Sequence, residues 1–178
     1  MIGPTSQLVD VAFAVCTALD SVGVRAILVG GSAATFYTGS YQSHDVDFVV
    51  SFYPRGTDAR GAIEALGFHL VGQHYAHPES SYTVDLLGGP AGIGDDLVTT
   101  WHTARRAGEI LHVYSRTDCV RDRLAAYYHW ADRSSLRVAL LVAGSGPIDL
   151  EAIESWSERE GSRTKFEEFD AALNGGPI

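Results

Sequence analysis

Several residue types and patterns are scarce in this chain, and each scarcity narrows what the protein can be. Only two cysteines, Cys16 and Cys119, occur among its 178 residues, which excludes a disulfide scaffold. Neither has the spacing of a metal or redox motif, and each lies in an apolar, helix-like context, so we expect two buried free thiols. No apolar run approaches the roughly 20 residues of a membrane helix, and the N-terminus lacks the basic stretch of a secretory signal. We therefore expect a cytoplasmic protein.

Positive charge is also scarce. Acidic residues outnumber basic ones by 22 to 13, which gives a formal net charge of −9, and Lys165 is the only lysine. This balance argues against broad non-specific nucleic-acid binding, which needs many phosphate contacts. Arginine binds phosphate through two parallel hydrogen bonds, so the arginines of this chain still suit a local nucleotide site.

The periodicity of the apolar residues predicts an α/β core followed by a helical C-terminal part. We place the core at residues 1–115 and the helical part, packed on the core, at residues 116–178. Helices are predicted at 5–23, 32–39, 55–67, 117–133, 134–144, 149–161 and 163–173, with Thr117 or Asp118 capping the fourth. Strands are predicted at 25–31, 44–52, 69–77 and 81–89, a hairpin at 96–115, and an ordinary surface loop or a lid at 88–96.

Two aspartates interrupt the apolar run of the second predicted strand. Side chains alternate along a strand, so Asp45 and Asp47 point to one face and Val46 to the other. Two ionised carboxylates side by side repel each other, and their pairing makes sense if a divalent cation lies between them. The alternative is that both acids lie at the solvated end of the strand.

Two further features favour a site over a solvated strand end. Gly30, Gly31 and Ser32 lie at a strand-to-helix junction, where glycine lets the backbone approach a ligand and the helix N-terminus attracts anions. We expect this turn to hold phosphates, with the Ser32 hydroxyl adding a contact. Taken alone, this junction also fits a tight turn with Ser32 as the helix cap. Asp85 is the only acid of the predicted strand 81–89, where it either completes a metal site, with a further role as general base, or lies at the strand edge.

The order of these motifs resembles the minimal nucleotidyltransferase domain of the polymerase-β superfamily. The matching residues are Gly30, Gly31 and Ser32, then Asp45 and Asp47, then Asp85. The stretches "YTGSYQSHDVDFVV" and "DCVRDRLAAYYHWADRSSL" are similar to those of small bacterial AbiEii-like and MenT-like nucleotidyltransferase toxins, and the resemblance extends from about Val24 to Leu141. It implies a polymerase-β-like core, a mixed sheet with flanking helices, followed by a helical C-terminal part.

The resemblance also implies a reaction. An NTP would bind with Mg²⁺ or Mn²⁺ at Asp45, Asp47 and Asp85, and its NMP would pass to a hydroxyl acceptor. That acceptor is an RNA 3′ end such as that of tRNA, a protein side chain or a small molecule, and a toxin–antitoxin context with a cognate protein partner is implied as well. The C-terminal helices permit a homodimer without requiring one.

The sequence departs from this family in one respect. Many such enzymes place a basic residue near the metal pair or in the short helix that follows the glycines, and "AATFYTGSYQS", residues 33–43, has none. The triphosphate would then be met by arginines, and the resemblance makes Arg123 the first choice among them. This departure leaves open a catalytically weak or inactive nucleotide-binding module of the same fold. A glycosyltransferase that uses a D-x-D motif fits less well, because the chain is short and the glycines precede the acids.

Overall fold

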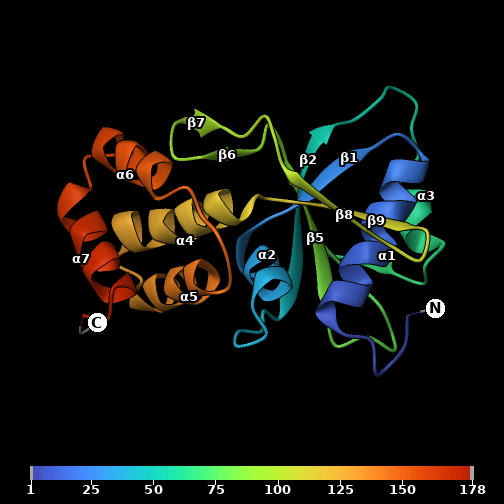
Figure 1. Cartoon of the computed structure of the whole chain (residues 1–178). Helices are drawn as coiled ribbons and strands as arrows, with labels where there is room; N and C mark the ends of the chain where they lie inside the picture. The colour runs from blue at the N-terminus through green and yellow to red at the C-terminus, as the bar shows by residue number, and fades with distance from the viewer. Residues whose placement is uncertain (1, 177–178) are drawn as a thin grey trace.

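The protein is described by a computed structural model that covers residues 2–176 (Figure 1). Within these residues seven helices occur, at Leu8–Ser21 (α1), Gly30–Tyr37 (α2), Ala59–Glu64 (α3), Arg116–Trp130 (α4), Arg133–Gly144 (α5), Leu150–Arg159 (α6) and Arg163–Leu173 (α7). The strands are Arg25–Leu28 (β1), Asp45–Phe52 (β2), His69–Val71 (β3), His74–Ala76 (β4), Thr83–Gly88 (β5), Gly92–Ile93 (β6), Asp96–Leu97 (β7), His102–Arg106 (β8) and Glu109–Val113 (β9).

A mixed sheet of seven strands forms the centre of the fold, in the order β3-β4-β5-β2-β1-β9-β8. β1 and β2 are antiparallel neighbours, whereas β2 and β5 run parallel, as do β1 and β9. In Figure 1, α1 and α3 lie at one end of the molecule and α4 to α7 at the other, with α2 between them. The predicted fold class, a mixed sheet with flanking helices and a helical C-terminal part, is confirmed. The division into two domains stays a prediction.

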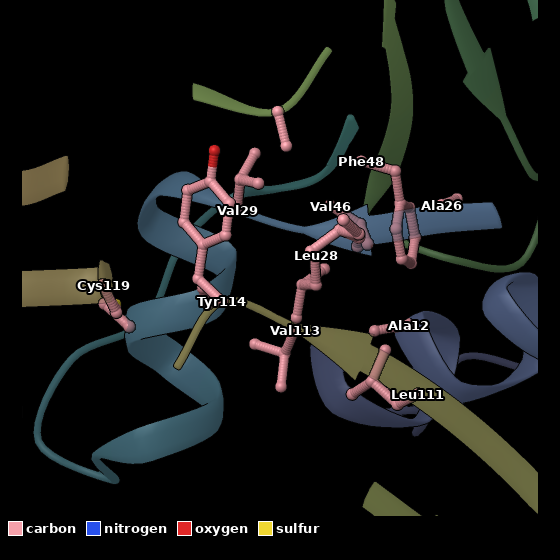
Figure 2. Packing of buried hydrophobic residues seen from close by; sticks show 14 of the residues in the cluster. Ala12, Ala26, Leu28, Val29, Val46, Phe48, Leu111, Val113, Tyr114 and Cys119 are labelled. Carbon is pink, nitrogen blue, oxygen red and sulfur yellow. The ribbon is translucent and has the colours of Figure 1, made fainter. Parts of the chain in front are cut away.

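The core forms where α1 packs on the central strands. Its fully buried residues recur at helical spacing, as at Leu8, Val11, Val15 and Leu19. Alternate residues of β2 face this helix side, and Figure 2 shows some of them packed together, including Phe48, with none of its surface exposed. Burying a side chain of this kind contributes roughly 1.5–3 kcal/mol, so the apolar face of β2 fixes the strand and, with it, the opposite face that carries the acids.

The C-terminal helices add buried side chains to the same hydrophobic core. Trp156 and Phe169 are completely buried, and the ring of Tyr128 stacks on that of Trp156 with centroids 5.5 Å apart. α4 contacts α2 of the core as well as α5 and α6. Cys16 and Cys119 are buried and free, as predicted. Among the described residues, no helix is both long and apolar enough to cross a membrane.

Three local predictions were wrong. The strand predicted at 69–77 is a hairpin of β3 and β4, because Gly72 adopts a left-handed φ of +64° that reverses the chain. The cap of α4 is Ser115, whose hydroxyl accepts the backbone N–H of Asp118 at 3.0 Å, rather than Thr117 or Asp118.

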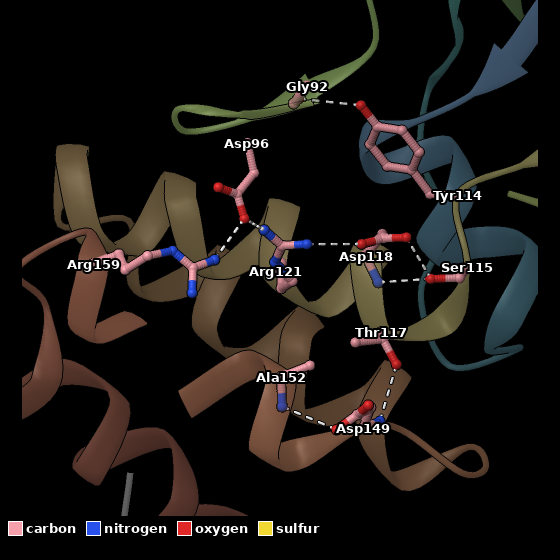
Figure 3. A network of polar contacts seen from close by, with 10 residues as sticks. All are labelled: Gly92, Asp96, Tyr114, Ser115, Thr117, Asp118, Arg121, Asp149, Ala152 and Arg159. Carbon is pink, nitrogen blue, oxygen red and sulfur yellow. Dashed lines mark hydrogen bonds and ion pairs between the residues drawn. The ribbon is translucent and has the colours of Figure 1, made fainter. Parts of the chain in front are cut away.

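The third correction concerns the segment predicted as an ordinary surface loop, which contains the two-stranded β6–β7 ribbon. Its carboxylate at Asp96 pairs with Arg121 of α4 at 2.5 Å and with Arg159 of α6 at 2.7 Å (Figure 3). The hydroxyl of Tyr114 donates a hydrogen bond to the carbonyl of Gly92. The β6–β7 ribbon is therefore held against α4 and α6 by ion pairs between residues far apart in the sequence. Local sequence patterns do not predict contacts of this kind.

Candidate functional site

Three carboxylates lie together on two neighbouring strands. The parallel register of β2 and β5 places Asp47 directly beside Asp85, and Asp45 lies two residues earlier on β2, on the same face. One carboxylate oxygen from each lies within 4.8 Å of the others. The predicted trio is thus brought together, and Asp85 faces the same side of the sheet as the aspartate pair.

The electrostatics of this cluster favour a bound cation. Partial burial, together with the nearby charges of Asp45 and Asp85, raises the pKa of Asp47 to about 6, whereas Arg123 opposes the shift. A carboxylate whose neighbours penalise its ionisation is stabilised by a positive ion. Three carboxylates also provide the oxygen ligands that Mg²⁺ and Mn²⁺ prefer, so Asp45, Asp47 and Asp85 fit a divalent metal.

The first glycine of the turn lies against the acids. Gly30 begins α2 with a left-handed φ of +65°, a conformation that L side chains rarely adopt. A Cβ at this position would lie 3.2 Å from Oδ2 of Asp47 and 3.7 Å from Nη2 of Arg123. Glycine here therefore lets the backbone approach both the carboxylate and the guanidinium.

The second glycine is tightly packed from another side. A Cβ at Gly31 would lie 2.9 Å from the hydroxyl oxygens of Ser43 and Tyr41, which is too close for a real contact. The segment before Asp45 therefore packs directly on the glycine turn, and a side chain at residue 31 would push it away.

Ser32 lies inside α2 and does not cap it. The helix begins at Gly30, and the serine is completely buried. Its hydroxyl donates to the carbonyl of Val29 at 2.7 Å and accepts the backbone N–H of Asp47 at 3.1 Å. In this structure Ser32 therefore joins the glycine turn to the strand that carries the acids, and the phosphate contact expected from the sequence stays a prediction.

The positive charge missing from residues 33–43 comes from α4. Besides its approach to Gly30, the guanidinium of Arg123 bonds to Oδ2 of Asp122 through Nε at 3.0 Å and Nη2 at 2.7 Å. This side chain is 20% exposed. A partly buried guanidinium beside a carboxylate cluster is suited to a phosphate group that accompanies a metal ion.

Sequence reasoning missed Ser43, which contacts Asp45, and Thr35, which bonds to Ser43. The hydroxyl of Ser43 donates to Oδ1 of Asp45 at 3.3 Å, and its backbone N–H donates to Oγ1 of Thr35 at 2.9 Å. The Thr35 hydroxyl donates in turn to the carbonyl of Gly31 at 3.1 Å. The spacing of two residues between Ser43 and Asp45 was the available signal, although Ser43 lies just before β2 and not within it.

Comparison with solved structures places this architecture among known folds. An antigenic nucleotidyltransferase-like protein from Paracoccidioides brasiliensis superposes with a TM-score of 0.68 at 16% identity, over 98% of this chain and 95% of that chain. ANT(2″)-Ia in complex with adenylyl-2″-tobramycin superposes with a TM-score of 0.47 at 16% identity, over 87% of this chain and 94% of that chain. A TM-score below 0.5 is too low to support an inference.

No family model matches the chain, and no curated protein does so either. The similarity to the Paracoccidioides protein spans nearly the whole of both chains. At 16% identity it supports a shared fold and nothing further. The closer resemblance to AbiEii-like and MenT-like toxins stays a prediction. The chain has a nucleotidyltransferase-like fold.

Proposed function

We propose that this protein is a metal-dependent nucleotidyltransferase that moves an NMP from an NTP to a hydroxyl acceptor. The main support for this proposal is one cluster of side chains. Carboxylate oxygens of Asp45, Asp47 and Asp85 lie within 4.8 Å of one another, beside the glycine turn. The fold agrees with this function, and the chemistry of the site gives the stronger support.

The three aspartates would hold one or two Mg²⁺ or Mn²⁺ ions. When bound, such ions neutralise the triphosphate and the leaving pyrophosphate and orient the reacting groups. The raised pKa of Asp47 supports this assignment, because a divalent cation offsets both the burial and the repulsion from Asp45 and Asp85 that raise it.

The residues of the chain would divide the remaining work. Arg123 would bind the phosphates through its fork of N–H donors, and the turn at Gly30 would let the nucleotide approach the backbone. Asp85 would accept the proton of the acceptor hydroxyl. The acceptor oxygen then forms a bond to the α-phosphorus while the bond from that phosphorus to the bridging oxygen breaks, and pyrophosphate leaves.

The acceptor carries a hydroxyl group at an RNA 3′ end, on a protein side chain or on a small molecule. The experiment incubates the whole protein with each α-labelled NTP and with whole-cell RNA, protein or small-molecule extract, in Mg²⁺ or in EDTA. We expect one acceptor class to become labelled in Mg²⁺ and to stay unlabelled in EDTA. Metal-dependent NTP binding by calorimetry without label in any acceptor would contradict transfer and support a binding module instead.

Arg123→Gln is expected to raise the KM for the NTP by about tenfold or more, because a neutral amide replaces a phosphate-binding guanidinium. The measurement is the initial rate of label transfer across NTP concentrations. Arg137→Gln is the matched control, since Arg137 lies exposed on α5 and should leave KM unchanged. An unchanged KM in the Arg123 variant would remove this residue from the nucleotide site.

A further inference from the structure

A cavity lies at the far end of α2 from the acids. Its volume is about 540 Å³, and its lining includes Phe36 and Tyr37 from the end of α2, His102 of β8 and Arg116 at the start of α4. Gly30 and Tyr37 stand seven residues apart, which corresponds to about 10 Å along a helix. The cavity is therefore separate from the carboxylate cluster, and its size lies within the usual range for a small-molecule site.

The charge of this cavity is unusual for so acidic a protein. Its lining contains a guanidinium and an imidazole, and no carboxylate is among the described residues that line it. Among residues 2–176, the arginines that pair with Asp or Glu are Arg25, Arg60, Arg106, Arg121, Arg123, Arg133, Arg159 and Arg163. Arg116 is not one of them, although the net charge of the chain is −9. An arginine without an acidic partner at a cavity wall is suited to an external anion.

The surroundings of Arg116 fix its position without neutralising it. Its guanidinium lies over the ring of Tyr37, 4.8 Å from the centroid, and Nη1 makes a long bond of 3.5 Å to the carbonyl of Pro147. Within residues 2–176, its buried Nε has no hydrogen-bond partner. The hydroxyl of Ser115, also in the lining, is already used to cap α4, so the helix terminus itself is not the basis of the site.

Aromatic rings lie beside the guanidinium. The rings of Phe36 and His102 are 6.2 Å apart between centroids, with 41° between their planes. Both line the cavity, and the His102 side chain is exposed. Nucleobases stack on aromatic rings of this kind whichever base is present, because every base has a π-face.

We propose that this cavity is a binding site for a mononucleotide, with its phosphate on Arg116 and its base stacked on His102 and Phe36. The charge, the unpaired guanidinium and the rings together select a ligand that carries a phosphate and a planar ring. This second site is independent of the proposed transfer reaction.

The test uses the full chain in EDTA, which keeps metal out of the carboxylate cluster, and measures AMP binding by calorimetry. One saturable site per chain with a Kd below about 1 mM is expected. Arg116→Gln should weaken AMP binding about tenfold or more. His102→Ala should weaken AMP binding about fivefold or more and leave the binding of inorganic phosphate unchanged, because only the stacked base is lost.

Three control variants locate the binding. Arg137→Gln, Asp45→Asn and Arg123→Gln should each keep the AMP affinity of the unmodified protein. Loss of binding in Arg123→Gln with retention in Arg116→Gln would assign AMP to the carboxylate site and overturn the proposal. Absence of saturable binding, or equal affinities of the unmodified protein and Arg116→Gln, would also overturn it. If Arg116→Gln does not fold by circular dichroism, the exposed His102→Ala variant decides by the same criteria.

Discussion

Asp47→Asn is expected to lower label transfer by about 10²–10³-fold or more and, in the absence of metal, to stabilise the fold. The first effect follows from the loss of an anionic metal ligand at the centre of the cluster. The second follows from the pKa of Asp47, which burial and the neighbouring Asp45 and Asp85 raise from 3.8 to about 6. The measurements are initial transfer rates at pH 8 with Mg²⁺ and urea unfolding with EDTA.

The sign of the stability effect is set by proton binding. Between pH 3.8 and about 6 the folded protein holds a proton on Asp47 that the unfolded chain has already released, so stability falls as the pH rises through this interval. Above it the ionised carboxylate costs roughly 1 kcal/mol, allowing for its partial exposure to solvent. Asparagine removes that cost, and the gain should be absent below pH 3.8.

Bound metal should make the unmodified protein more stable than Asp47→Asn, the reverse of the order expected in EDTA. Mg²⁺ is expected to raise the urea midpoint of the unmodified protein through preferential binding to the folded state, and to raise that of Asp47→Asn much less. Asp95→Asn is the control, because Asp95 is exposed on the β6–β7 ribbon and should leave both rate and stability unchanged. Full transfer activity in Asp47→Asn would refute the assignment of this residue as a metal ligand.

Ser32→Ala is expected to lower the free energy of unfolding by about 1–3 kcal/mol, because it leaves the partly buried N–H of Asp47 without its partner. The loss should appear in urea unfolding without any nucleotide. Transfer should also slow, since Asp47 loses the bond that ties its strand to the glycine turn. Ser21→Ala provides the comparison: its exposed hydroxyl bonds only to the nearby carbonyl of Ala18, and we expect a change under about 0.5 kcal/mol.

This variant distinguishes two roles for the serine. If the hydroxyl served only the phosphate contact expected from the sequence, the nucleotide-free protein would keep its stability and only the KM for the NTP would rise. Unchanged stability together with a raised KM would therefore contradict the structural role inferred here.

The sequence by itself determined the features that depend on local periodicity. Strand alternation put Asp45 and Asp47 on one face, and the glycines marked the turn before α2, because both follow from steric rules that act within a few residues. The apolar patterns of α1 and β2 likewise indicated the core face of each element.

The tertiary structure alone decided which distant residues complete the site. The register of β2 against β5 brought Asp85 beside Asp47, and the packing of α4 on α2 supplied the guanidinium of Arg123 that residues 33–43 lack. It also turned Ser32 inward, toward the backbone of Asp47. Strand register and helix packing are set by the burial of many side chains at once, so no short stretch of the sequence contains them.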